Sequence, residues 1–146
     1  MILVRKVVGA VLSRPVVCRW LAVTVGLVAV ALDWPFGDFQ GHTHWNNVGW
    51  IPFVSPPIRL LDMAQNVLLF APFGFFAALA HRPPARHAVR NAVLMTAGLS
   101  FFGEGSQLYS HGRFPSATDL TCNVIGAALT AVLAVSPFVQ DLISTS

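Results

Sequence analysis

Long apolar segments alternate with short polar ones along the chain. Four segments are apolar enough to cross a membrane: 16–32, 62–80, 88–107 and 119–139. A membrane-spanning helix needs roughly 20 such residues. The pattern therefore predicts an all-α polytopic membrane protein, a bundle of four transmembrane helices that forms a single domain over residues 1–146.

Composition supports the membrane assignment. Of 146 residues, 55% are hydrophobic and 10% are charged, whereas soluble domains carry about 25% charged residues. The net charge is +3, but the basic residues flank apolar segments and form no nucleic-acid-binding motif, so nucleic acid is not an expected partner. The sequence also lacks a phosphate-binding glycine loop, a nucleophile elbow and a paired-cysteine metal motif. Cys18 and Cys122 fall near opposite ends of different predicted spans, so we expect no disulfide.

The distribution of basic residues predicts the topology. Arg59 and Arg113 lie in or beside the 33–61 and 108–118 connections, and the other seven of the nine basic residues lie on the opposite side: Arg5, Lys6, Arg14, Arg19, Arg82, Arg86 and Arg90. By the positive-inside rule, both termini are cytoplasmic and these two connections face outward. A rival interpretation of the first segment is a cleavable signal peptide, because Ala29-Val30-Ala31 follows a basic stretch and an apolar run.

One polar motif occurs twice at the outer start of a predicted span. Asp62 and Asn66 are four residues apart, as are Asp119 and Asn123, and the two pairs are 57 residues apart (119 − 62 = 57). Residues four apart share a helix face. Both copies enter the membrane from the same side, which predicts two parallel two-helix repeats whose polar faces converge. Alternatively, the aspartates only cap helices and the asparagines only join them.

The third segment adds polar residues to the same outer region. Thr96, Ser100, Glu104 and Gln107 are spaced 4, 4 and 3 apart, on one helix face. A carboxylate inside a span is a functional candidate, and it is costly without a cation. We therefore expect Arg113 to pair with Glu104, with Arg59 as the matching arginine of the first half. Arg113 as an interfacial anchor is the alternative.

The 33–61 connection is rich in aromatic residues, which is typical of a segment in the membrane interface. It contains His42 and His44, which suggest a metal site, but no third ligand stands at a recognisable spacing. We therefore predict no metal site and no cofactor, although a divalent cation could still join the carboxylates. His111 is a further candidate for acid–base chemistry.

These motifs follow one another in a characteristic order. They are Trp50-Ile51-Pro52-Phe53, Asp62-x-x-x-Asn66-x-x-x-Phe70-x-Pro72-x-Gly74, Glu104-x-x-Gln107, Gly112-Arg113 and Asp119-x-x-x-Asn123-x-x-Gly126. Over residues 50–133 the combination resembles the VanZ-like family of small bacterial membrane proteins. Thr130 departs from it, since the family tends to have a second glycine there.

The resemblance implies location and partners. It implies a multi-pass protein of the bacterial cytoplasmic membrane with membrane lipids as partners; no protein partner can be identified. The family is named for a protein associated with teicoplanin resistance, and a remote similarity to enzymes that exchange or remove lipid head groups has been suggested.

Two functions then compete. In the first, Glu104 or Asp119, with His111 as a further candidate, acts catalytically on a lipid head group. The substrate-binding residues would be Arg113, Arg59, Gln107, Asn123, Asp62 and Asn66. In the second, the same pocket only binds an envelope lipid or an amphiphilic antibiotic.

Overall fold

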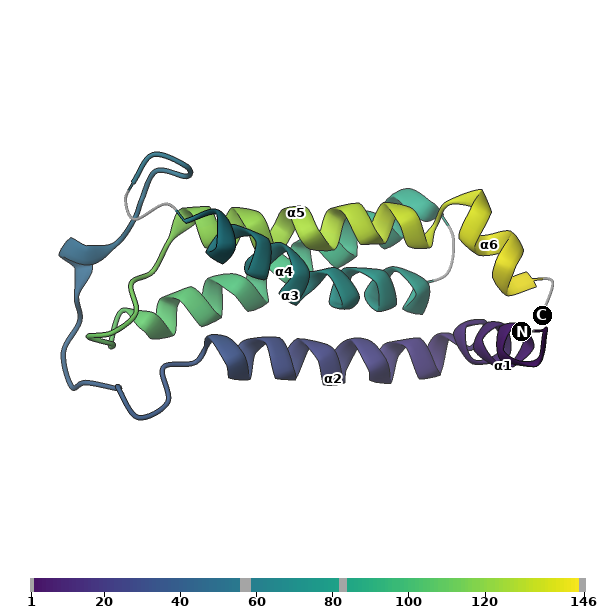
Figure 1. Cartoon of the computed structure of the whole chain (residues 1–146), viewed down its shortest axis with the longest axis horizontal. Helices are drawn as coiled ribbons and strands as arrows, with labels where there is room; N and C mark the ends of the chain where they lie inside the picture. Colours follow the sequence, from purple (N-terminus) through teal and green to yellow (C-terminus); the bar gives the residue numbers. More distant parts are fainter. Residues whose placement is uncertain (1, 56–58, 82–83, 145–146) are drawn as a thin grey trace.

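The computed structural model (Figure 1) describes residues 2–55, 59–81 and 84–144, with side chains from residue 7 onward. These residues form helices and connections, with two isolated β-bridges and no β-strand among them. The elements in chain order are α1 (Ile2–Leu12), α2 (Pro15–Asp33), the short 3-10 helix η1 (Trp45–Asn47), α3 (Leu60–Ala80), α4 (Ala85–Gln107), α5 (Ala117–Ala134) and α6 (Pro137–Ser144). Both termini lie at one end of the bundle, and the long connection after α2 (described over 34–55) and the short 108–116 connection lie at the other (Figure 1).

The prediction of membrane helices is confirmed for α2, α3 and α5, which are long and apolar enough to cross a membrane. Helix α4 covers the predicted third span. The predicted fourth span, 119–139, extends too far toward the C-terminus, because α5 ends at Ala134 and a separate helix starts at Pro137. Proline fits the first turn of a helix but not its interior, so Pro137 begins α6 rather than extending α5.

Helices α3 and α5 run in the same direction and touch at their backbones (Figure 1). A Cβ atom on Gly74 would overlap the backbone of Ala127, and one on Gly126 would overlap the carbonyl of Val67. Small residues allow this close approach in membrane helices. Thr130, the departure from the family pattern, donates a hydrogen bond across the pair to the Ala71 carbonyl at 2.5 Å. It therefore joins the two helices where the family places glycine.

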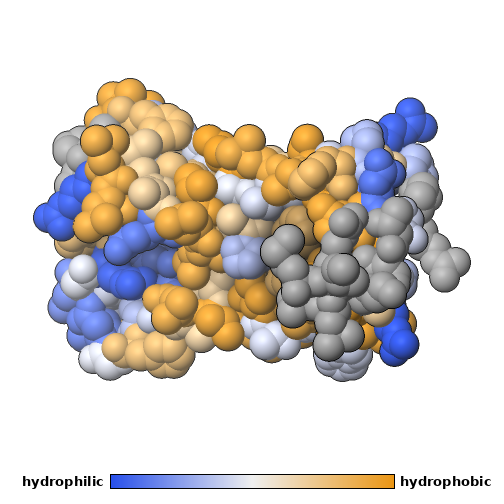
Figure 2. Space-filling view, turned by 45° about the vertical axis from the view of Figure 1, so that its right-hand side comes forward, coloured by the Kyte–Doolittle hydropathy of each residue, from blue (hydrophilic) through white to orange (hydrophobic). Residues whose placement is uncertain are grey.

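The bundle interior is filled mainly by alanines around Phe70 and Phe73, both fully buried. Large apolar side chains point outward instead, among them Trp20, Leu27 and Leu68, each about two-thirds exposed. Figure 2 shows apolar residues over the middle of the visible face and hydrophilic residues toward its ends. An outward apolar belt suits lipid rather than water as the surrounding solvent. Cys18 and Cys122 are buried and unbonded to each other, which confirms the expectation of no disulfide.

The two connections at the end away from the termini are held together by backbone hydrogen bonds. Gly49 donates to the Pro115 carbonyl at 2.9 Å, and Ala117 donates to the Gly49 carbonyl at 2.9 Å. The backbone N–H of Phe53, a non-glycine residue with φ of +59°, donates to the Thr118 hydroxyl at 2.9 Å. The long connection therefore folds back onto the start of α5 and closes this end of the bundle.

Candidate functional site

A cavity of about 290 Å³ lies at the connection end of the bundle. Its wall includes seven of the nine residues selected from the sequence: Arg59, Asp62, Asn66, Glu104, Gln107, Arg113 and Asp119. They come from the residue before α3, from α3 itself, and from the consecutive stretch formed by the end of α4, the short connection and the start of α5. We call this space the head-end cavity.

The two copies of the repeated motif meet at the head-end cavity through their first residues. Asp62 and Asp119 lie in the first turns of α3 and α5, where aspartate is favoured by the free N–H groups and the helix dipole. The Asp62 carboxylate and the Asn66 side chain both lie close enough to Asp119 to act on its carboxylate. Amide and carboxylate from different copies thus face each other.

Glu104 is almost fully enclosed at the cavity wall, with 6% of its surface exposed. Its Oε2 accepts a hydrogen bond from the backbone N–H of Ser116 at 2.7 Å. One turn further along α4, Gln107 Nε2 donates to the Asp33 carbonyl at 3.4 Å. These contacts tie the last turn of α4 to the start of α5 and the end of α2.

Arg113 pairs with Asp33 and not with Glu104, so the expected Glu104–Arg113 ion pair is wrong. Its Nη1 lies 3.9 Å from Asp33 Oδ1 and donates to the carbonyls of Leu32 and Asp33 at 3.2 and 2.9 Å. The C-terminal end of α2 presents free carbonyls and the negative end of its dipole, which attract a guanidinium. Glu104 is instead satisfied by Ser116.

Asp33 is a cavity residue that the sequence analysis did not select. It is buried, and its Oδ2 has no hydrogen-bond partner within the described residues. The available signal was its position, since it is the first charged residue after the apolar run of α2.

Two selected residues do not line the cavity. Asn123 is fully buried and donates from Nδ2 to the Ser100 hydroxyl at 2.9 Å, joining α5 to α4. His111 is exposed on the short connection, beside His42 and His44 of the long connection. Burial and the neighbouring imidazoles lower the pKa of His44. Hydrogen bonds from Ser110 and Gly112 lower the pKa of Asp38, which lies close by.

The charges of the cavity restrict its chemistry. Four carboxylates line it (Asp33, Asp62, Glu104 and Asp119) against two guanidinium groups, Arg59 and Arg113. With all six ionised the net charge is −2, and one arginine is already paired with Asp33. Such a wall suits a ligand that carries a cationic group, or a phosphate accompanied by a divalent cation, for which carboxylate oxygens are suitable ligands.

Comparison with known proteins identifies the family. A model of the VanZ/LLP1 family matches residues 18–140, which include every residue that lines the cavity. Searches of curated proteins and of solved structures gave no match. The family match covers most of the chain and agrees with the motif order described above, so the chain belongs to the VanZ/LLP1 family.

Proposed function

We propose that the head-end cavity binds the polar head group of a membrane lipid or lipid-linked envelope molecule. The observation that carries this proposal is the position of the cavity: a wall of four acids and two arginines at the end of an apolar belt. An amphiphile can insert its chains along such a belt while its head group enters the polar site. A soluble ligand has no apolar chains to pack along the belt.

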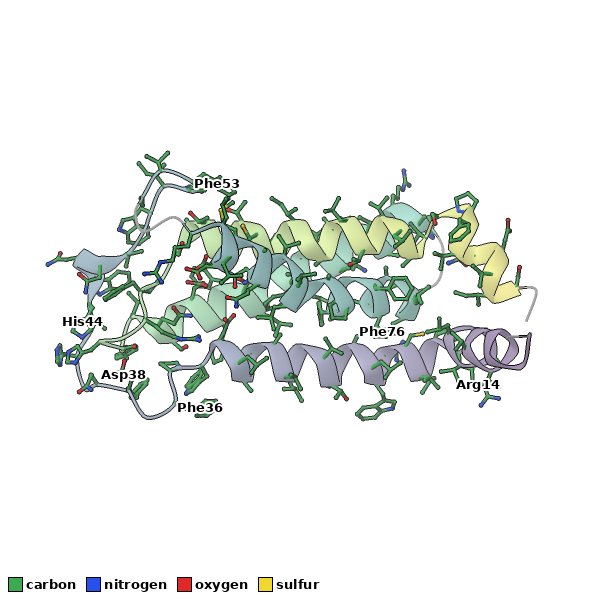
Figure 3. All side chains as sticks on the ribbon, in the orientation of Figure 1. Arg14, Phe36, Asp38, His44, Phe53 and Phe76 are labelled. Carbon is green, nitrogen blue, oxygen red and sulfur yellow. The ribbon has the colours of Figure 1, made fainter. Side chains whose placement is uncertain are left out.

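The proposed topology puts this cavity on the outer side, with four spans and cytoplasmic termini. Helix α4 serves as the third span, in addition to α2, α3 and α5, because its 23 residues extend about 34 Å, enough for a hydrocarbon core of roughly 30 Å. Its polar residues Thr96, Ser100 and Glu104 are buried, while Leu94 and Phe101 are exposed. Arg14 lies at the end opposite Asp38 and His44 (Figure 3), as the positive-inside rule requires for an inner end. In this arrangement α2–α3 and α4–α5 are the two parallel repeats.

The charges favour a head group with both a phosphate and an amine. Arg59 is the available partner for the phosphate, because Arg113 is held by Asp33 and the end of α2. Asp62 and Asp119 then face the amine. A link to teicoplanin-type resistance follows if the bound molecule is a lipid-linked envelope component, or the antibiotic itself.

Catalysis on the head-group linkage is the second candidate, favoured by the enclosed carboxylate of Glu104 at the cavity wall. Glu104 or Asp119 would act as base or nucleophile while Arg59 holds the phosphate. His111 is left out of this mechanism because it does not line the cavity.

Native mass spectrometry of the detergent-purified protein tests both candidates. The wild type should retain lipid, and Arg59→Met should weaken retention roughly tenfold by removing a charged hydrogen bond. Arg90→Met, a matched arginine change at the opposite end of α4, should leave it unchanged. Equal loss in both variants, or no retained lipid in any of them, would contradict head-group binding.

Adding defined lipids and following their head groups separates binding from catalysis. Head-group loss in the wild type that disappears in Glu104→Gln supports catalysis. Intact lipid bound by both proteins supports binding alone.

A further inference from the structure

Three histidines from two connections converge at the end of the bundle away from the termini. His42 and His44 belong to the long connection and His111 to the short one, and one ring nitrogen of each lies within 4.8 Å of the others. The ring centroids are 4.7 Å apart for His42 and His44, 5.4 Å for His42 and His111, and 4.5 Å for His44 and His111. Figure 3 shows His44 at the outermost edge of this end.

This spacing matches three imidazoles around one tetrahedral ion. With metal–nitrogen bonds of about 2.1 Å, tetrahedral geometry places the ring centres about 5 Å apart. The observed separations, 4.5 to 5.4 Å, bracket that value. Three protein ligands would leave the fourth position to water.

Backbone hydrogen bonds hold the ligand-bearing segments in place. His44 donates to the Leu108 carbonyl at 2.8 Å, and Gln40 donates to the Tyr109 carbonyl at 2.6 Å. The Asp38 carboxylate accepts from the Ser110 hydroxyl at 2.5 Å and from the Gly112 N–H at 2.6 Å. The two connections are thus joined on both sides of His111, and the imidazoles meet in a supported arrangement.

Two features of the cluster indicate that a cation binds there. The Nε2 atom of His44 is buried and has no hydrogen-bond partner among the residues that the structure describes. Buried polar atoms are normally satisfied, so this one points to a missing partner. The Asp38 carboxylate acts electrostatically on both His44 and His111, supplying negative charge beside the cluster. Metal-bound histidines commonly have such a carboxylate nearby.

We propose that His42, His44 and His111 bind one Zn²⁺ ion, which fastens the long connection to the short one. Imidazole ligands in a tetrahedral arrangement suit zinc, whereas magnesium and calcium prefer oxygen ligands. Gly112 and Arg113 follow His111 directly and line the head-end cavity. The ion therefore stabilises one wall of the cavity. The proposal does not depend on what the cavity binds.

Zinc binding by the full chain in detergent tests the proposal, with the affinity tag removed because oligohistidine binds zinc. After metal is stripped with a chelator, zinc is titrated against a chromophoric competitor, and bound metal is counted by mass spectrometry. We expect one Zn²⁺ per chain. His111→Gln should bind at least about tenfold more weakly, since even changes outside the ligand shell cost that much. His87→Gln, at the opposite end of the molecule, is the matched control and should bind like the wild type.

Hydrogen exchange on the wild type supplies a second readout that needs no substitution. Zinc should slow exchange in peptides covering 38–48 and 107–113 and leave those covering 84–94 unchanged, whereas magnesium should have no effect. Zinc binding that survives His111→Gln would overturn the proposal. So would binding that disappears only when Cys18 and Cys122 are replaced, or zinc addition that leaves exchange in both connections unchanged.

Discussion

The same Asp-x-x-x-Asn motif stands at the start of α3 and of α5, yet its two copies have different surroundings. On α3, Asp62 and Asn66 are both half-buried and both line the head-end cavity. On α5, only Asp119 lines the cavity, while Asn123 is fully buried against Ser100 of α4. The start of α5 is bonded to α4 through Ser116–Glu104 and Asn123–Ser100, which accounts for the burial of its asparagine. Identical motifs thus line the cavity with both residues in one helix and with only the first residue in the other, where the asparagine packs against α4.

Disrupting the backbone contact between α3 and α5, which brings the two copies of the motif together, should have the largest effect on stability. Gly126→Ala would place a methyl group on the Val67 carbonyl, so α3 and α5 must separate. We expect a loss of about 3 kcal/mol or more, measured by denaturant unfolding in detergent. Gly98→Ala on α4 is the control, because its methyl group meets nothing within 4 Å. Its helix propensity should raise stability by up to about 1 kcal/mol. Equal costs at both glycines would show that the backbone contact is unimportant.

Substitutions of the two asparagines, Asn66 and Asn123, should affect different properties: lipid binding in the first case and stability in the second. Asn123→Ala removes the partner of the buried Ser100 hydroxyl and should cost about 2 kcal/mol. Asn66→Ala opens onto the cavity, where water can replace the amide, and should cost less than about 1 kcal/mol. Retained lipid, measured by native mass spectrometry, should fall in Asn66→Ala and not in folded Asn123→Ala. Similar profiles for the two variants would remove the distinction between the copies.

Helix capping also differs between the copies. The Ser116 hydroxyl accepts from the Asp119 N–H at 3.3 Å, whereas Arg59 at the matching position of α3 forms no side-chain capping bond. Ser116→Ala should therefore cost about 1 kcal/mol and speed hydrogen exchange in the first turn of α5. Arg59→Ala should leave exchange in α3 nearly unchanged. A comparable effect in both helices would argue against the capping difference.

The smallest expected effect concerns the coupling of Arg113 to two acids, Asp33 and Glu104. Arg113 is half-exposed, so its pair with Asp33 should contribute only about 0.5 kcal/mol in a double-mutant cycle of Arg113→Met and Asp33→Asn. The corresponding cycle with Glu104→Gln should give a smaller coupling, because Glu104 is bonded to Ser116. A larger coupling to Glu104 than to Asp33 would restore the pairing expected from the sequence.

Much of the helical arrangement could be predicted from local pattern alone. Apolar length locates α2, α3 and α5, and polar spacing identifies the inward face of α4, whose four predicted members are all buried. The break before α6 was missed, because the apolar segment 119–139 was taken as one span although Pro137 cannot continue a helix interior. These features depend on residues close together in the chain.

What sequence reasoning missed depends on contacts between distant segments. Asp33 becomes the partner of Arg113 only because the end of α2 docks against the short connection, 80 residues away along the chain. His111 joins His42 and His44 only because backbone hydrogen bonds align the two connections. No spacing rule within one helix or motif could indicate either contact.

The central claim is that residues of both halves surround one bound head group. Thiol labelling tests it directly in a variant lacking Cys18 and Cys122, with single cysteines at Gln65 of α3 and Phe114 of the short connection, which both line the cavity. Gly41, on the long connection away from the cavity wall, is the control position. We predict that retained lipid slows labelling at both Gln65→Cys and Phe114→Cys. Removing the lipid should abolish the protection at both positions at once, and labelling of Gly41→Cys should not change. Lipid that protects only one of the two cavity positions, or neither, would contradict a shared head-group site.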